Sequence, residues 1–181
     1  MRGRPAVWSA AVCCWTWRFY AAAGRAYDPE SDHEISAADL RETAQAQGTV
    51  LETGDILLIR TGWAGRLMGA DPARQAAMMD FAQQRSPGLE PGAGTAGYLW
   101  NAHVAAVAAD NAALEVMRPG TGFPLHQDLL PLLGIPIGEY WVLDRLAEEC
   151  ARDRSYTFML VSVPLNLRGG IGSPPQAVAV K

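Results

Sequence analysis

The chain has 181 residues, of which 49% are hydrophobic and 19% charged, and its formal net charge at pH 7 is -4. This length is typical of one domain that buries roughly 70% of its unfolded surface, and the composition excludes a disordered chain. Because the arginines are scattered and form no basic run, we expect no nucleic-acid partner and favour a small molecule or a protein. No segment approaches the roughly 20 apolar residues that span a membrane.

The first residues carry a partial signal-peptide pattern. Arg2 and Arg4 precede the run PAVWSAAVCCW, and the small residues of AAAGRA follow. Tryptophan, serine and threonine in this region make a poor apolar core for such a peptide. Cys13, Cys14 and Cys150 fit neither a disulfide framework nor a zinc-finger spacing, and they indicate a reducing compartment. We therefore expect a cytoplasmic protein, with export as the alternative.

The first half of the chain alternates helix and strand patterns. ISAADLRETAQAQG predicts a helix with Ser36 as N-cap, Asp39 three residues later and Gly48 as C-cap. The apolar run of residues 56–59 predicts a buried strand that leads into a turn at residues 61–63. Residues 71–84 have helical composition.

The second half continues the alternation. The segment SPGLEPGAGTAG predicts a loop, YLWNAH a helix and VAAVAAD a strand. LHQDLLPLLG has helical spacing that Pro131 interrupts, IPIGEYW is short and extended, and LDRLAEECARD is helical. SYTFMLVSVPL and the terminal AVAV predict strands. This order favours an α/β domain with a mixed, largely buried β-sheet and flanking helices.

One His and one Glu stand out in PLHQDLLPLLGIPIGEYW. An unpaired Glu139 inside an apolar strand would cost several kcal/mol, so it calls for a cation or a hydrogen-bonding partner. Gly134 and Gly138 allow close backbone approach beside that strand, as a recessed site requires. An imidazole from His126 with a carboxylate suits zinc or manganese, but a catalytic metal usually takes three protein ligands.

These segments together resemble a known family. ISAADL, GDILLIRTGW, VAAVAADNAALEV, PLHQDLLPLLGIPIGEYWVLDRLA and VPLNLRGGIGSPPQAVAV follow, in that order, the C-terminal half of the cyclase family. Bacterial kynurenine formamidases, enzymes of tryptophan catabolism, belong to it, and isatin hydrolase is related. The resemblance covers residues 35–180 and implies a β/β/α fold that is N-terminally incomplete.

The resemblance also implies an activity and part of a site. Family members are metal-dependent hydrolases of amide-type bonds, with zinc or manganese as cofactor, a small amide or lactam as substrate, and a homo-oligomeric assembly. The matching family residues make His126 and Glu139 metal ligands. The other ligands and the proton-transfer His belong to a motif, H-x-G-T-H-x-D-x-P-x-H, that no segment of this sequence matches. The catalytic residue is therefore unknown, and we expect weak or absent metal binding and little hydrolysis.

The coding frame gives a hypothesis for the N-terminus. Read from the third base of each codon, VCCWTW and Arg18 encode Leu-Leu-Asp flanked by Val, Leu or Met, and family members carry GVLLDVA at this point. Residues 1–18 are then an atypical, frame-shifted N-terminus, and residues 19–181 form a partial cyclase-family domain.

Three further residues follow predicted strands. Asp110, Thr61 and Trp63 stand where α/β sheets bind ligands, so they are candidates for lining the site. For Asp110 a turn or helix cap is an equal alternative, and a tryptophan is more often a packing residue. His33, in the polar loop ESDHE, is expected to be exposed.

Two other interpretations stay open. The chain could be a non-catalytic remnant that serves as a binding or oligomerisation module. Alternatively, a partner chain could supply the missing ligands.

Overall fold

The computed structural model describes residues 7–11, 14–16, 24, 26–170, 172–174 and 176–181. Its strands are β1 (Val7–Ala11), β2 (Cys14–Thr16), β3 (Glu34–Ile35), β4 (Ile56–Arg60), β5 (Gly88–Leu89), β6 (Ala106–Ala109), β7 (Ile137–Gly138), β8 (Thr157–Val161) and β9 (Val178–Val180). Its helices are α2 (Ala37–Gln47), α3 (Trp63–Gly69), α4 (Pro72–Met78), α5 (Ala93–Asn101), α6 (Pro124–Gln127), the π-helical turn η1 (Asp128–Leu133) and α7 (Asp144–Asp153).

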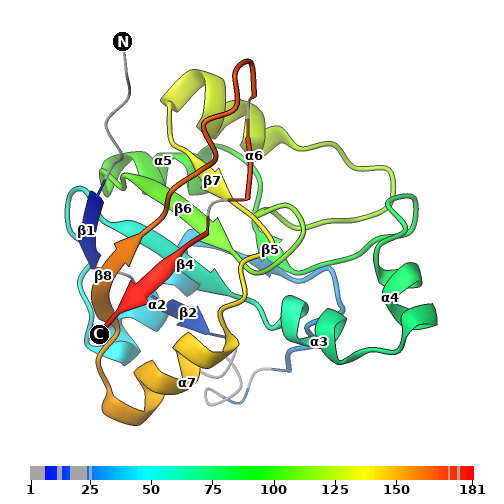
Figure 1. Cartoon of the computed structure of the whole chain (residues 1–181), viewed down its shortest axis with the longest axis horizontal. Helices are drawn as coiled ribbons and strands as arrows, with labels where there is room; N and C mark the ends of the chain where they lie inside the picture. Colours follow the sequence, from blue (N-terminus) through cyan, green and yellow to red (C-terminus); the bar gives the residue numbers. More distant parts are fainter. Residues whose placement is uncertain (1–6, 12–13, 17–23, 25, 171, 175) are drawn as a thin grey trace.

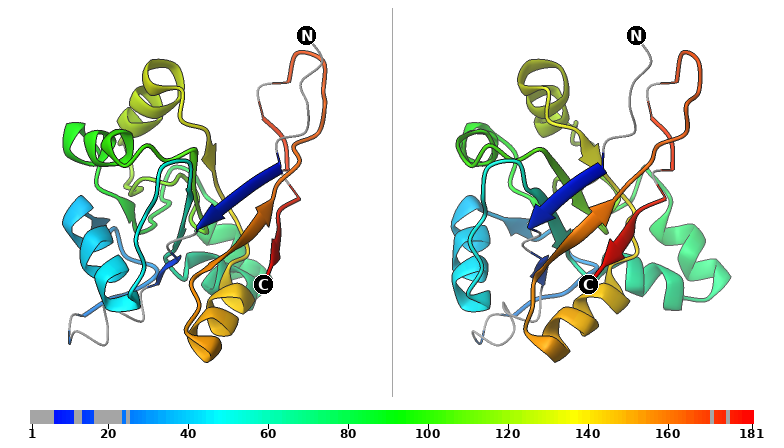
Figure 2. Two further views of the ribbon diagram at one scale, coloured as in Figure 1. Left: turned by 90° about the vertical axis from the view of Figure 1, so that its left-hand side faces the viewer. Right: turned by 60° about the vertical axis from the view of Figure 1, so that its left-hand side comes forward.

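The elements form layers around a parallel sheet (Figure 1). The central sheet has the order β2-β4-β6-β7, and each pair in it is parallel. A second sheet, β1-β8-β9, is antiparallel, and β3 pairs with β5 in a short parallel ribbon. Figure 2 shows the antiparallel sheet on one side of the central sheet and α2, α5 and α6 on the other. The expectation of an α/β fold with a mixed, buried sheet and flanking helices is confirmed.

Strand β4 joins the two main parts of the core. Leu57 and Ile59 face a cluster with residues of α2, α5, α6 and η1, whereas Ile56 and Leu58 face a cluster with residues of β8 and α7. Alternate residues of a strand point to opposite faces, so a continuous apolar run fits a strand that is covered on both sides. This explains why the run at residues 56–59 has no polar interruption.

Helix α2 has the ends that its sequence predicts. The Ser36 hydroxyl accepts a hydrogen bond from Asp39 N, and the Asp39 carboxylate accepts one from Ser36 N, which completes a capping box. Gly48 ends the helix with φ of 67°, a left-handed conformation that glycine adopts at little cost.

The helix expected over residues 71–84 is shorter. It starts after the N-cap Asp71 but ends at Met78, and the prediction for the remaining residues was wrong. Farther on, Ser86 exchanges backbone hydrogen bonds with Met117, and Gln84 is buried. Tertiary pairing of this segment therefore overrides its helical composition.

The N-terminal hypotheses concern residues that are only partly described. The backbone of β1 pairs with β8, and that of β2 pairs with β4. The frame-shift and signal-peptide interpretations also depend on residues 1–6, 12–13 and 17–18, which lie outside the described residues. Within the described ranges, no helix is long and apolar enough to cross a membrane.

Candidate metal centre

The site lies at one edge of the central sheet. The parallel strands β4, β6 and β7 all end there, so Thr61, Asp110 and Glu139 follow the carboxyl ends of three neighbouring strands. This is the edge at which open α/β sheets bind ligands. Helix α6 brings His126 to the same edge, where its ring contacts Glu139.

His126 has a carboxylate beside each ring nitrogen. Its Nδ1 is 2.8 Å from Glu115 Oε1, and its Nε2 is 3.0 Å from Glu139 Oε1. The Glu115 side chain is 1% exposed and that of Glu139 is 30% exposed. The ring therefore connects a buried carboxylate with one that solvent reaches.

These contacts change the acidity of the imidazole. The hydrogen bonds with Glu115 and then Glu139 raise the pKa of His126 from 6.5 to about 9, although partial burial acts in the opposite direction. At neutral pH the protonated ring can thus donate to both carboxylates. A cation that binds Nε2 must displace the proton from that nitrogen, so binding would be favoured by rising pH.

Glu139 directly follows a glycine, Gly138, that is packed closely against neighbouring side chains. It directly follows β7 rather than lying inside a strand, which corrects the expected placement. A Cβ on Gly138 would lie 2.7 Å from the Cβ of Ala108 and 2.6 Å from Nε1 of Trp141, so only glycine fits there. The close approach expected at Gly138 is present, although the neighbouring atoms belong to side chains and not to a backbone. Gly134, in contrast, has open space around it and serves as the left-handed end of η1.

Asp110 and Thr61 are fully buried and bind each other. Asp110 Oδ1 accepts from Thr61 N at 2.6 Å and from Thr61 Oγ1 at 2.7 Å, and its Oδ2 accepts from Gly62 N at 2.8 Å. These bonds join the end of β6 to the turn after β4. A role for either residue in lining the site stays a prediction.

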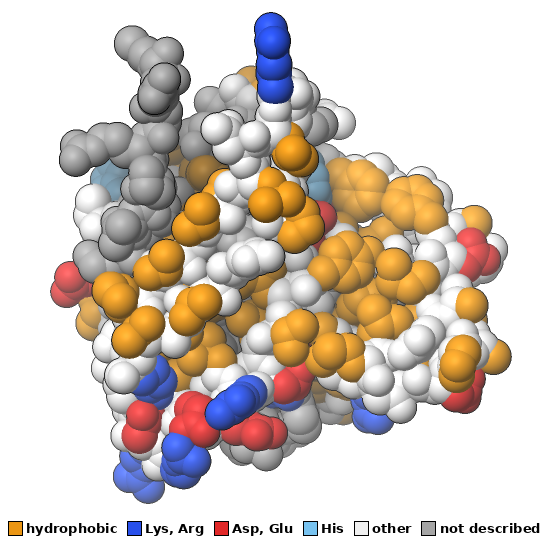
Figure 3. Space-filling view, viewed as in Figure 1, with side chains coloured by type: hydrophobic (Ala, Val, Ile, Leu, Met, Phe, Trp, Pro, Cys, Tyr) orange, Lys and Arg blue, Asp and Glu red, His pale blue; other side chains and the backbone are white. Residues whose placement is uncertain are grey.

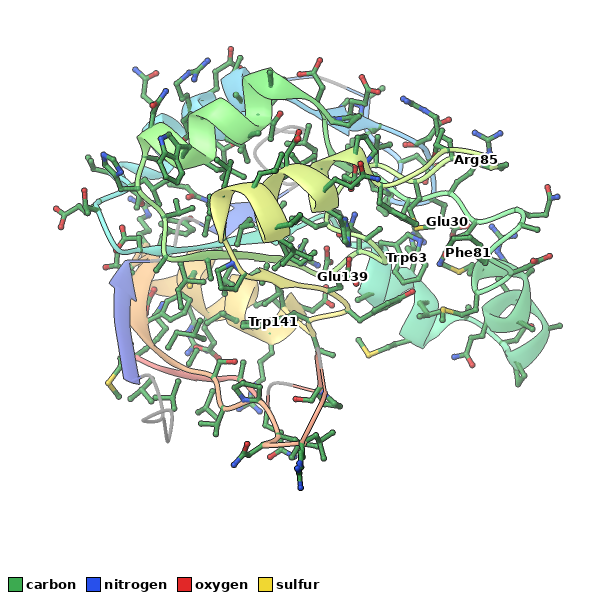
Figure 4. The ribbon with its side chains drawn as sticks, turned by 90° about the horizontal axis from the view of Figure 1, so that it is seen from above. Glu30, Trp63, Phe81, Arg85, Glu139 and Trp141 are labelled. Atoms are coloured by element: carbon green, nitrogen blue, oxygen red, sulfur yellow. The ribbon has the colours of Figure 1, made fainter. Side chains whose placement is uncertain are left out.

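Trp63 is also fully buried, and its connection to the site is a ring contact with Tyr140. Its Nε1 donates to Arg85 O at 3.2 Å, and its ring meets the edge of Tyr140 with the centroids 5.7 Å apart. Tyr140 directly follows Glu139. In Figure 4, Glu139, Trp63 and Phe81 follow one another toward α4.

Aromatic rings continue from the imidazole toward solvent. The Phe123 ring lies 5.2 Å from the His126 ring and 6.0 Å from that of Phe81, measured between centroids. Phe81 is exposed, and Phe123 is half-buried. Figure 3 shows a group of hydrophobic side chains on the surface to the side of α3 and α4. An apolar surface thus adjoins the site of His126 and Glu139.

Sequence reasoning missed Glu115. The residue stands in the apolar segment AALEVM, and a carboxylate in such surroundings is the signal that could have identified it. His33 was expected to be exposed but is half-buried, because its ring packs against Tyr27 with the centroids 5.4 Å apart.

The residues present fit a share of a metal site. An imidazole nitrogen and a carboxylate oxygen lie together, and the second ring nitrogen is held by a buried carboxylate, as in most histidine ligands. Throughout the part of the chain that the structure describes, however, no group of three or more His, Cys, Asp or Glu side chains could hold an ion. His126 and Glu139 are thus suited to hold a divalent cation only with further ligands.

Comparison with known proteins identifies the family. The Cyclase family model, described as "Putative cyclase", matches residues 18–116, more than half of the chain. The protein belongs to this cyclase family. The matched region includes Glu115 but ends before His126 and Glu139. A search of curated proteins found no match.

Solved structures extend the likeness over nearly the whole chain. A crystal structure of a novel cyclase is 36% identical, with a TM-score of 0.79, over 96% of this chain and 53% of that one. An isatin hydrolase bound to the product analogue thioisatinate is 20% identical, with a TM-score of 0.65, over 98% of this chain and 65% of that one. A potential metal-dependent hydrolase with cyclase activity is 17% identical, with a TM-score of 0.54, over 92% and 63%.

The similarity has a limit in length. The chain spans between about half and two thirds of the length of these solved structures. The last two structures show a shared fold, and the first supports the family as well.

Proposed function

We propose that this chain carries part of the active site of a metal-dependent hydrolase that cleaves a small amide-type substrate. One observation carries the proposal: His126 Nε2 and Glu139 Oε1 are 3.0 Å apart at the ligand-binding edge of the sheet, while Nδ1 is engaged elsewhere. His126 and Glu139 would hold zinc or manganese. Membership of the cyclase family and the shared fold of a potential metal-dependent hydrolase support this assignment.

The proposed chemistry divides between the cation and the chain. A bound divalent cation would supply Lewis acidity toward a carbonyl oxygen and make water more acidic. The chain contributes two ligands, the imidazole nitrogen of His126 and a carboxylate oxygen of Glu139. Together they would fix the position of the cation at the sheet edge. A carboxylate and an imidazole suit zinc and manganese alike.

The aromatic surface supports a substrate with an apolar ring. Phe123 contacts the imidazole, and Phe81 extends the surface outward. Offset or edge contacts with such rings add roughly 0.5–1.5 kcal/mol beyond area burial. An aryl formamide or a small lactam fused to a ring would place its amide near His126 and its ring on this surface.

We expect low activity from this chain alone. A catalytic zinc usually has three protein ligands, and the described residues bring two together. The chain should therefore bind a divalent cation weakly and turn over an aryl formamide slowly. Complete lack of binding would instead favour the alternative of a non-catalytic binding or oligomerisation module.

Calorimetric titration of the purified chain with Zn²⁺ or Mn²⁺ tests the proposed ligands. We expect weak binding that His126→Ala or Glu139→Ala abolishes, because each change removes one of two donors. His103→Asn is the matched control: it removes an exposed imidazole that precedes β6, at the opposite end of the strands. Equal binding by wild type and His126→Ala would refute the assignment, and fast turnover by the wild-type chain would refute the expected low activity.

A further inference from the structure

We propose that Glu115 is the positioning residue of this site: its buried carboxylate fixes the His126 ring so that Nε2 faces Glu139 and the cation. The contact between Glu115 and the ring stands on geometry alone. The consequence for a cation rests on the proposed function.

The carboxylate of Glu115 holds His126 at two points. Oε1 accepts hydrogen bonds from His126 N at 3.1 Å and from His126 Nδ1 at 2.8 Å, and Oε2 accepts one from Leu125 N at 3.0 Å. The backbone N–H and the ring Nδ1 of His126 thus donate to the same oxygen of Glu115. This pairing restricts both side-chain torsions of His126, since rotation about either would break the Nδ1 contact.

Fixing the ring determines which nitrogen faces the cation. With Nδ1 donating its proton to Glu115, Nε2 is the nitrogen that faces Glu139, and a cation that displaces its proton can bind there. Glu115 itself is unsuited as a ligand, because it is 1% exposed and both of its oxygens already accept hydrogen bonds. Its role is therefore to act through His126.

The main chain of Glu115 is fixed in turn by β5. Leu89 N donates to Leu114 O at 2.9 Å, and Val116 N donates to Leu89 O at 3.0 Å, so the segment pairs with β5 on both sides of Glu115. Asn111 Nδ2 donates to Glu115 O at 3.2 Å. A Cβ on Gly88 would lie 2.4 Å from Glu115 O, so glycine is required for this approach. The carboxylate therefore projects from a rigid support.

Glu115→Gln tests the role with little change in volume. The amide oxygen can replace one carboxylate oxygen, but the NH₂ group then meets a backbone N–H and cannot accept from it. We expect Zn²⁺ affinity to fall about 10- to 100-fold, as for other partners of ligating histidines. Glu148→Gln, which removes an exposed carboxylate of α7, is the matched control and should bind Zn²⁺ as wild type does.

Ring nitrogen spectra of ¹⁵N-labelled protein give a readout that a purely structural role would not move. The chain has only three histidines, so His126→Asn assigns the signals. In wild type we expect the Nδ1–H of His126 to exchange with water far more slowly than that of the exposed His103, with and without Zn²⁺. In Glu115→Ala, which removes both oxygens that can accept from Nδ1, this protection should be lost. An unchanged ring spectrum in that variant would overturn the proposal.

The two proposals can fail separately. If the wild-type ring is protected but no Zn²⁺ binds, the metal site fails and the positioning by Glu115 stands. If Zn²⁺ binds through His126 while Nδ1–H exchanges as fast as in His103, the positioning role fails. This wild-type comparison decides the matter even if the Glu115 variants do not fold.

Discussion

Asp110 is a buried acid whose contribution to the stability of the fold depends on pH. Burial raises the pKa of its carboxyl from 3.8 to about 6, and hydrogen bonds from Thr61 and Gly62 oppose that rise. Between these two pH values the folded chain holds a proton that the unfolded chain has released. The contribution of Asp110 to stability is therefore full below about pH 4 and decreases as the pH rises through about 6.

Asp110→Asn should destabilise the fold and remove this dependence. The amide nitrogen cannot accept the hydrogen bond from Gly62 N, so we expect a loss of about 1–3 kcal/mol in the free energy of unfolding. The difference from wild type should be largest near pH 4 and smaller above about pH 6. Urea unfolding at several pH values measures it, and a difference that stays constant with pH would contradict the assigned pKa.

Individual residues also show where sequence reasoning ends. His126 and Glu139 could be selected because a family motif and an exceptional carboxylate marked them. Glu115 could not be placed from its sequence position, because its contact with His126 depends on the path of the loop after β6 and on the space left by Gly88. Such contacts arise from tertiary structure and leave no periodic pattern in the chain.

Among the elements, α2 offers the clearest test of local sequence signals. Ser36→Ala removes the acceptor for Asp39 N, so we expect a loss of about 1 kcal/mol in the free energy of unfolding. Ser36→Thr keeps a hydroxyl and should remain close to wild type. Urea unfolding of both variants makes the comparison. An alanine variant as stable as wild type would show that the capping box contributes nothing here.

Elements with strong end signals could be predicted, and others could not. Ser36 and Gly48 mark both ends of α2, and the apolar run of β4 reflects burial on both faces. The end of α4 at Met78 carries no such mark, because the pairing of Ser86 with Met117 sets the path of the following segment. The helical spacing around Pro131 was recognised, and the structure resolves it into α6 and the π-helical turn η1.

At the scale of the whole molecule, the antiparallel sheet presents an exposed apolar face. Met159 of β8 pairs with Val180 of β9, and Val178 lies two residues earlier on the same strand. All three side chains are exposed, at 41%, 48% and 57% respectively. An unprotected strand edge with apolar side chains favours association. Figure 3 shows hydrophobic side chains along β8 and β9.

This face is where we expect copies of the chain to associate. Sedimentation velocity should show a homo-oligomer for wild type, and Val178→Lys with Val180→Lys should shift the protein toward the monomer by placing charges on the edge. Exchanging the exposed Val50, distant in sequence, for Lys is the control. A monomeric wild type would contradict the expected assembly.

The two proposed ligands are close in the chain, with 13 residues from His126 to Glu139, whereas the ion pair between Arg60 and Asp144 joins residues 84 apart. The entropy lost on closing a loop grows with its length, so bringing these two ligands together in the unfolded chain costs less than it would for a pair as distant as Arg60 and Asp144. Zn²⁺ or Mn²⁺ would therefore also bind His126 and Glu139 in part of the denatured ensemble. Binding to both states weakens the thermal stabilisation that a ligand confers, so affinity at this site would translate poorly into a higher melting temperature.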